Sequence, residues 1–195
     1  MASYRTEREE YEGRYPPSSV LTEISWWHNI LLIPDFYREL RPKGPLLDLG
    51  IFVNASTDWG IGILFGELWM AFHLANDWKI PGRDICWLET AAIELLIYVL
   101  EAKGFHDIYI LIHSDNQGTI GAMKKACSPN YWINMSMRRT CGVLGPLFIQ
   151  TELEYIESAL NPADPISRGI LGPEDKKLPL LFQLPDELSS VITYV

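Results

Sequence analysis

The strongest constraint on the fold is a succession of short apolar segments that begins at Leu46. The first three have the length and the β-branched and aromatic content of strands, and Gly66-Glu67 predicts a hairpin turn between the second and the third. A longer apolar segment follows and ends at Gly104, which is typical of a helix. In chain order, the sequence predicts strands at 46–54, 61–66 and 67–74, a helix at 85–103, a strand at 107–113, helices at 116–126 and 131–148, a strand at 152–157 and a short helix at 162–168.

This order of elements defines the expected fold class. Three consecutive strands followed by helix–strand units predict an α/β domain, with a mixed five-stranded sheet and helices on both of its faces. The first and fourth strands are expected to be neighbours at the centre of the sheet. Their carboxyl ends then share one edge, which is where open α/β sheets place their ligands.

The regions that flank the sheet differ in composition. Residues 1–20 are polar and include Pro16-Pro17, which predicts a flexible arm. Residues 21–45 are apolar and aromatic, and they predict a short helix followed by an extended piece. The folded domain is expected to span 46–170, and a Pro- and Leu-rich irregular tail to span 171–195.

The bulk composition excludes several classes of protein. The chain is 48% hydrophobic and 21% charged, which is typical of a globular protein. Its apolar runs are too short to cross a bilayer and its first residues lack a signal segment, so no membrane partner and an intracellular location, cytoplasm or nucleus, are expected. The three cysteines show no clustered spacing, and neither a disulfide partner nor a zinc site is expected.

Charge argues against a free-standing nucleic-acid binder. The net charge is −9, whereas such proteins are usually basic. Residues 104–149 nevertheless hold four Lys/Arg against two Asp, so a local basic face is compatible with the sequence. A domain that is tethered to a nucleic-acid-binding partner also needs less affinity of its own, because the tether supplies effective concentration.

Four positions carry the chemical argument. Asn54 ends the first predicted strand, Glu89 lies near the start of the long helix, Asp115 follows the fourth strand, and Asp164 begins the last short helix. Carboxylates gathered at one sheet edge repel one another unless a cation lies between them. Hard oxygen ligands suit Mg²⁺ or Mn²⁺, and two such ions can activate water and stabilise the leaving oxygen at a phosphodiester.

Four motifs in this order resemble the ribonuclease H domain of retrotransposon reverse transcriptase polyproteins, of the fungal type. They are N-A-S-T-D-W-G-I-G-I-L-F (54–65), W-L-E-T-A-A-I-E-L-L (87–96), H-S-D-N-Q-G-T-I (113–120) and N-P-A-D-P-I-S-R-G (161–169). The segment around Trp26-Trp27 resembles the tether between the polymerase and the ribonuclease H. The resemblance covers residues 21–170 and implies a ribonuclease-H-like sheet with the strand order 3-2-1-4-5.

The resemblance also implies an activity and a set of partners. The family hydrolyses the RNA strand of RNA/DNA hybrids by two-metal catalysis, next to the polymerase domain of the same polyprotein. Its metal ligands carry over to Glu89, Asp115 and Asp164, which implies two Mg²⁺ or Mn²⁺ ions. The first-strand aspartate does not carry over, because Asn54 stands in its place. A neutral amide with one acceptor oxygen cannot replace a bridging carboxylate, so we expect activity to be absent or severely reduced and metal binding to be weakened.

Three explanations of Asn54 are open. It is an engineered inactivating change, or the copy is decayed or domesticated, or Asp58 supplies the missing carboxylate from the turn. The last explanation requires a ligand four residues farther along the chain to move by several ångströms.

Polar and basic side chains near the acids and on the later predicted helices are candidates for contacts with a phosphate backbone. The alternative for each of them is a cap or a solvated helix face. The candidate nucleic-acid-binding residues are Ser56, Asn116, Gln117, Lys124, Lys125, Arg138 and Arg139. Of the two glutamates on the long helix, only Glu89 can face the site, and Glu94 is expected to be solvated or paired.

Two other functions fit the same motifs. The first is a catalytically dead or domesticated module that binds nucleic acid or serves as a scaffold. The second is an integrase or resolvase of the broader fold. In integrases the last acid of the site is usually a Glu on a long helix, whereas the last motif acid of this chain is Asp164, which lies between prolines.

Overall fold

The computed structural model describes residues 18–32 and 42–195, which belong to two compact units, Met1–Pro42 and Lys43–Val195. In the first unit, helix α1 spans Ser18–Leu31. The rings of Trp26 and Trp27 on α1 are exposed and meet edge to face, with centroids 4.9 Å apart. A helix was predicted here. The arm expected at 1–20 lies outside the described residues except for 18–20, which belong to α1, and the extended piece lies mostly outside them.

The second unit is built on one mixed sheet. Its strands are β1 (Leu46–Leu47), β2 (Ile51–Ala55), β3 (Gly60–Phe65), β4 (Leu68–Leu74), β5 (Tyr109–Ser114), β6 (Gln150–Tyr155) and β7 (Ile192–Tyr194). β2, β3, β4 and β7 pair in antiparallel fashion, whereas β5 is parallel to β1, β2 and β6. β6 pairs with the whole of β5, so β1 and β2 lie in succession along the other edge of β5.

The central five strands confirm the expected arrangement. Their order is β4-β3-β2-β5-β6, which is 3-2-1-4-5 when the strands are counted along the chain without β1 and β7. The single strand expected at 46–54 is divided into β1 and β2. The division occurs at Gly50, which has φ +63° and whose N–H donates to Asp48 Oδ1 at 2.9 Å.

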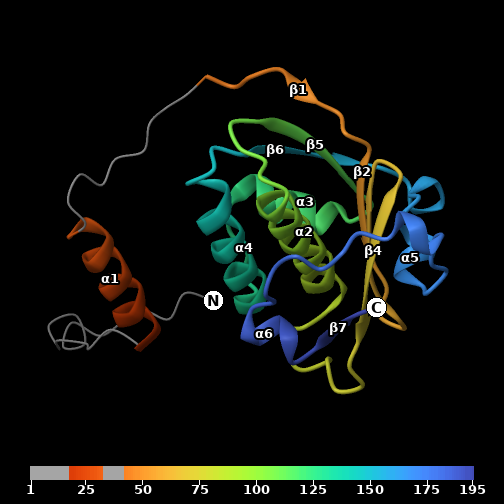
Figure 1. The fold of residues 1–195 in the computed structure, drawn as a ribbon. Coiled ribbons are helices and arrows are strands. Elements are labelled where there is room, and N and C mark those ends of the chain that lie inside the picture. Colours follow the sequence, from red (N-terminus) through yellow and green to blue (C-terminus); the bar gives the residue numbers. More distant parts are fainter. Residues whose placement is uncertain (1–17, 33–41) are drawn as a thin grey trace, which may run out of the picture. The chain divides into compact units, whose positions relative to one another are not determined.

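Helices cover both faces of this sheet (Figure 1). One face carries α2 (Ile85–Ala102), α3 (Gln117–Lys125) and α4 (Tyr131–Leu144), and the other carries the short α5 (Asp164–Ser167). Asp84 caps α2 by accepting the Trp87 N–H at 3.0 Å, and Gly104 follows its end with φ +76°. α4 ends before Gly145, whereas the prediction extended it to 148.

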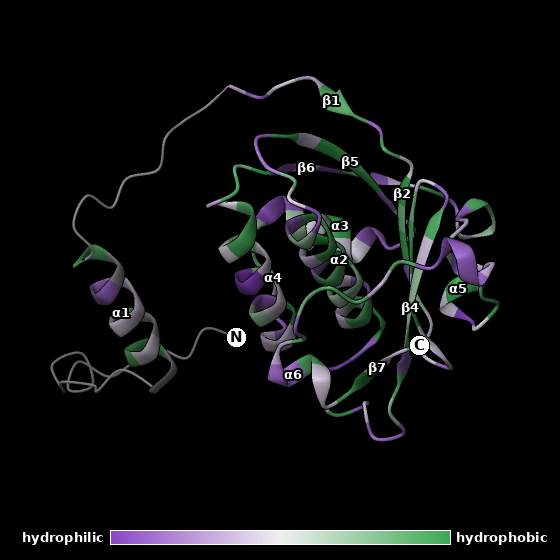
Figure 2. Ribbon diagram, viewed as in Figure 1, coloured by the Kyte–Doolittle hydropathy of each residue, from purple (hydrophilic) through white to green (hydrophobic). Residues whose placement is uncertain are grey.

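The main core lies between the sheet and α2. In Figure 2, most of the ribbon of β2 and β5 has the colour of hydrophobic residues. Thirteen of the eighteen residues of α2 are buried, because the sheet covers one side of the helix and α4 and the C-terminal segment contact others. The largest fully buried side chains are Trp87, Phe72, Ile51, Ile61, Ile63, Met70, Leu88, Ile93, Leu95, Leu96, Ile97 and Leu100.

The C-terminal segment is part of the fold, which corrects the expectation of an irregular tail. Leu178 and Ile192 are each 2% exposed, and Leu188 is fully buried. The segment crosses α2, forms η2 (Glu174–Lys176) and α6 (Asp186–Ser189), and returns as β7 along the free edge of β4. The compact unit therefore continues to Val195, past the boundary expected at 170. The sequence pattern alone did not show that the apolar side chains of this segment are buried.

The described helices include none with the length and apolar character needed to cross a lipid bilayer.

Candidate functional site

The carboxyl end of β2 brings Asn54 against Asp164, the last acid of the four motifs. Asn54 is 2% exposed, and its Nδ2 donates to Asp164 Oδ1 at 2.9 Å. The two residues are separated by 110 positions in the sequence. The structure therefore places the first and last motif residues in direct contact.

Glu89 reaches the same place from the first turns of α2. It is 2% exposed, and its Oε1 accepts the backbone N–H of Ala55 at 2.9 Å. Its Oε2 is buried and has no hydrogen-bond partner in the described part of the chain. Burial, with smaller contributions from the charges of Asp115 and Asp164, raises the pKa of Glu89 to about 8. At neutral pH this carboxyl group is predominantly protonated.

Asp115 follows β5 directly and is half-buried. β5 lies parallel to β2, with Phe52 opposite His113, so both strands deliver their last residues to one edge. The negative charge of Asp115 contributes to the raised pKa of Glu89, which places the two carboxyl groups within electrostatic reach. The cap of α3 is Asn116, whose Oδ1 accepts the Thr119 N–H at 2.9 Å. Asp115 is thus not used as the cap.

Two residues without an assigned role in the sequence position Asp164. Asn161 is 3% exposed, donates to the Val53 carbonyl at 3.0 Å and accepts the Ala163 N–H at 3.0 Å. These hydrogen bonds of Asn161 therefore hold the turn before α5 against β2. Gly62 lies opposite Asn54 on β3, and a Cβ there would lie 2.5 Å from the Ser167 nitrogen. The absence of a side chain lets α5 lie directly on the sheet.

Arg168 belongs to the motif at 161–169 but had no role assigned from the sequence, and it contacts Asp164. Its Nε lies 2.9 Å from Asp164 Oδ2 and 3.1 Å from Oδ1. The hydrogen bonds from this guanidinium lower the pKa of Asp164. The available signal was the spacing of four residues between the acid and the arginine, which places both on one side of a helical turn.

Asp58 does not take the place of the missing aspartate. It is exposed in the turn between β2 and β3, where its N–H donates to Ser56 Oγ at 3.3 Å. Its charge contributes to raising the pKa of Arg168. The explanation that Asp58 substitutes for a carboxylate at Asn54 therefore finds no support in this geometry.

The residues at this edge do not fit two divalent ions as they lie. Asn54 directs an N–H donor at Asp164, where a bridging oxygen ligand is required. Arg168 already neutralises Asp164, and Glu89 is predominantly protonated at neutral pH. Within residues 18–32 and 42–195, no group of three His, Cys, Asp or Glu side chains is arranged to hold an ion. The motif residues lie at one sheet edge, but Asp164 is paired with Arg168 and Glu89 is held in its protonated form.

The candidate nucleic-acid-binding residues do not share one environment. Ser56 is 7% exposed and is engaged in the turn after β2, and Asn116 caps α3. The Nζ of Lys124 lies 3.7 Å from Oε1 of Glu152, so this cation is next to an acid. Gln117, Lys125 and Arg138 are exposed, so their predicted contacts with nucleic acid stay predictions.

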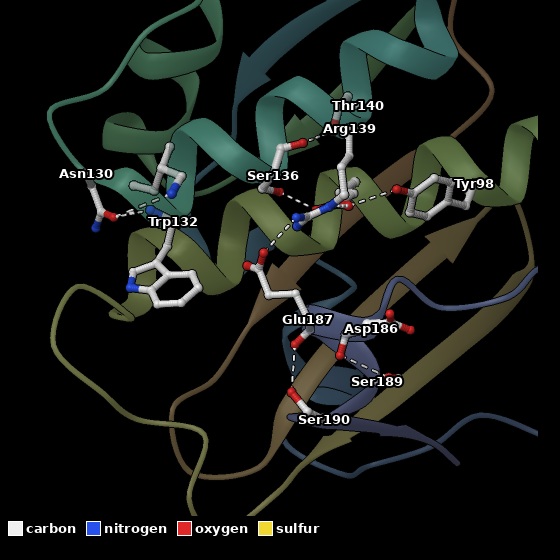
Figure 3. A network of polar contacts seen from close by, with 12 residues as sticks. Tyr98, Asn130, Trp132, Ser136, Arg139, Thr140, Asp186, Glu187, Ser189 and Ser190 are labelled. Carbon is white, nitrogen blue, oxygen red and sulfur yellow. Dashed lines mark hydrogen bonds and ion pairs between the residues drawn. The ribbon is translucent and has the colours of Figure 1, made fainter. Parts of the chain in front are cut away.

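Arg139 is a correction to the expected nucleic-acid-binding set. Its Nε donates to Glu94 Oε1 at 2.6 Å, and its Nη1 donates to Glu187 Oε2 at 2.8 Å (Figure 3). Its side chain is 21% exposed and Glu94 is fully buried. Arg139 therefore joins α4 to α2 and α6 and is not available for phosphates. The sequence placed it beside Arg138, and only packing separates their roles.

Comparison with known proteins gives a limited result. No family model and no curated protein matches the chain. Among solved structures, the chain is similar to the ribonuclease H1 of the halophilic archaeon Halobacterium salinarum NRC-1, with 13% sequence identity and a TM-score of 0.44. The alignment covers 65% of this chain and 100% of that chain. The chain's own strand order and strand directions are those of a ribonuclease-H-like α/β fold.

Proposed function

We propose that this chain is a ribonuclease-H-like domain of a retroelement reverse transcriptase that binds RNA/DNA hybrids and, with Asn54, cleaves them poorly or not at all. The observation that carries the proposal is the contact of Asn54 with Asp164, 2.9 Å apart, beside Glu89 and near Asp115. Four motif positions from four separate segments meet at one sheet edge. This is the arrangement that the resemblance to ribonuclease H requires.

The inactivity follows from the charges at that edge. A phosphodiester hydrolase of this type needs oxygen ligands that hold cations against the scissile phosphate. Here Asn54 is neutral and Asp164 is paired with Arg168. We therefore propose that Mg²⁺ or Mn²⁺ binds weakly at Glu89, Asp115 and Asp164, and we derive no catalytic step through these ions.

Hybrid binding is proposed for the side chains that remain exposed. Gln117 at the start of α3, Lys125 at its end and Arg138 on α4 are exposed. A hybrid duplex is recognised by its shape, its phosphates and its 2′-hydroxyls, so a few such contacts suffice without base readout. Because the whole chain has a net charge of −9, the domain depends on a polymerase partner for much of its affinity.

The decisive experiment is cleavage of a labelled RNA/DNA hybrid in Mg²⁺ or Mn²⁺ by this chain and by Asn54→Asp. We expect Asn54→Asp to raise the cleavage rate at least about tenfold, which is a barrier change of about 1.4 kcal/mol. Asn29→Asp, at an exposed position on α1, is the matched control for an added charge and is expected to change nothing. Adding Glu89→Gln to Asn54→Asp is expected to remove the gain, which assigns the cleavage to this site.

A second candidate function is a scaffold module of the same fold. The amide of Asn54 favours it, because a working centre requires a carboxylate at that position. The same assay separates the two functions: if neither protein cuts or binds the hybrid, the scaffold function is preferred and the proposal above is wrong.

A further inference from the structure

The two outer strands of the sheet are treated differently by the rest of the chain. At one end of the sheet, β7 pairs with the free edge of β4 and covers it. At the other end, β6 pairs with β5 along its whole length, and no second strand in the ranges 18–32 and 42–195 pairs with it. The outer edge of β6 is therefore open.

The backbone groups at this open edge are identified by the pairing of β6 with β5. The Gln150 N–H donates to the Ile108 carbonyl at 2.7 Å, and alternate residues of a strand face the same neighbour. Gln150 and the second residues after it therefore direct their backbone groups at β5. The N–H and C=O groups of Thr151, Leu153 and Tyr155 point the other way and are open to another strand.

β6 lacks most of the features that usually protect an edge strand. Such strands are commonly blocked by lysine, proline, a bulge or a covering segment. The strand Q-T-E-L-E-Y contains neither lysine nor proline, and its register with β5 runs without a bulge. A hollow of about 390 Å³ lies beside it, and its lining includes the apolar Leu111 and Ile120 and the acids Glu152 and Glu154. The edge thus has both open backbone groups and room beside them.

The two acids of β6 indicate which kind of strand fits. Glu152 and Glu154 share one face of the sheet by the period of two, and their side chains are 38% and 61% exposed. The hydroxyl of Tyr109 donates to Glu152 at 2.7 Å and, with the nearby charge of Lys124, lowers its pKa. An antiparallel second copy of β6 centred on Leu153 would place Glu152 opposite Glu154 twice. Like charges in opposite positions are destabilising, so a basic strand fits this edge better than a second copy does.

We propose that the open edge of β6 binds an extended, basic peptide segment of a protein partner, which adds a strand to the sheet. Backbone hydrogen bonds to Thr151, Leu153 and Tyr155 supply affinity, and alternate side chains supply specificity. Lysine or arginine at every second position faces Glu152 and Glu154, and the small apolar residues between them face the side of α3. This interaction surface goes beyond the proposed function and uses none of the acids of the four motifs.

The test is isothermal titration calorimetry of the full chain with a short synthetic peptide in which lysine alternates with valine. One control peptide has the same residues grouped by type, which keeps the charge and removes the alternation. A second control carries N-methyl groups at alternate residues, so that it cannot donate backbone hydrogen bonds to β6. We expect both controls to bind at least about tenfold more weakly, because several backbone hydrogen bonds are lost.

Variants of the protein locate the binding at β6. Glu152→Gln combined with Glu154→Gln is expected to weaken binding about fivefold, as for exposed ion pairs, and the difference is expected to shrink with added salt. Glu67→Gln combined with Glu174→Gln is the matched control, since these exposed acids also lie beside lysines and belong to another part of the surface. Thr151→Pro removes an outward N–H and no bond to β5, and it is expected to weaken binding while circular dichroism stays unchanged.

Three results would overturn the inference. Equal binding of the alternating and the grouped peptide would show attraction by charge alone. Equal effects of the two glutamine pairs would place the peptide elsewhere on the protein. Self-association of the peptide-free chain that Thr151→Pro abolishes, measured by sedimentation velocity, would show that the edge takes a second copy. None of these results bears on hybrid cleavage, so the proposed function is tested independently.

Discussion

Two glutamates on α2, five residues apart, are both buried and have opposite surroundings. Glu94 is fully buried, and its oxygens accept hydrogen bonds from Arg139, Ser136 and Tyr98. Glu89 is 2% exposed, and it accepts one backbone N–H, while its second oxygen has no partner among the described residues. Both oxygens of Glu94 accept hydrogen bonds, whereas one oxygen of Glu89 has no donor among the described residues.

The difference separates a structural acid from an acid of the site. Buried polar groups are nearly always paired, so an orphaned oxygen at a sheet edge where other acids meet indicates a group kept for chemistry. The network around Glu94 instead joins α2, α4 and α6 and gives the C-terminal segment a fixed place (Figure 3). The motif and the helical spacing assigned Glu89 to the site and left Glu94 either solvated or paired, and the structure shows that Glu94 is buried and paired.

Replacement of Arg139, the cation paired with Glu94, is expected to have the largest effect on stability. Arg139→Met leaves a fully buried carboxylate without its cation, and we expect the free energy of unfolding to fall by about 3–5 kcal/mol. Chemical denaturation measures this loss. Lys125→Met, at an exposed position at the end of α3, is the control and is expected to change stability little. Equal stabilities of the two variants would contradict the structural role of the Glu94 network.

The pH dependence of stability is expected to identify Glu89. Its pKa in the folded protein is about 8, above the value near 4.5 of an unperturbed glutamate, so the folded state holds the proton more tightly. Its contribution is fully present below about pH 4.5 and is lost as the pH rises toward 8, and the loss between pH 5 and pH 8 is on the order of 3–4 kcal/mol. Glu89→Gln is expected to abolish this fall, and denaturation at pH 5 and pH 8 measures it. An unchanged slope in that variant would show that the carboxyl is ionised in the folded state.

The third prediction tests the charge balance around Glu89. Asn54→Asp adds a carboxylate next to Asp164 and Glu89, and we expect it to lower stability by about 1–2 kcal/mol in the presence of a chelator. Addition of Mn²⁺ is expected to recover part of this loss in Asn54→Asp and none in the unmodified chain. Thermal unfolding with and without the ion gives the comparison. An Asn54→Asp protein as stable as the parent would mean that the edge tolerates a further negative charge.

The smallest effect is expected at the outer end of the Glu94 network. Glu187→Ala removes the second acid that Arg139 contacts, 2.8 Å from Nη1, and we expect a loss of about 1 kcal/mol. Glu94 keeps Arg139, Ser136 and Tyr98 in this variant, which explains the smaller effect. Combination with Arg139→Met in a double-mutant cycle measures the coupling, and additive losses would show that α6 does not share the network.

Much of the fold was predictable because local patterns determine it. The five central strands, α2 and the hairpin at Gly66 follow from strand-length apolar segments, a long apolar helix and turn residues. The motifs also indicated the meeting of Asn54, Glu89, Asp115 and Asp164. The division of the first strand at Gly50 and the addition of β7 were missed, because each depends on pairing with distant backbone.

The sequence by itself determined the fold class, the order of the sheet and the loss of a bridging carboxylate at Asn54, because these depend on residue type and spacing. The tertiary structure decided the partners. It placed Arg139 on Glu94 and left one oxygen of Glu89 without a donor among the described residues. Burial joins residues that are far apart in the chain, so spacing along the sequence does not show which of these distant charges will pair.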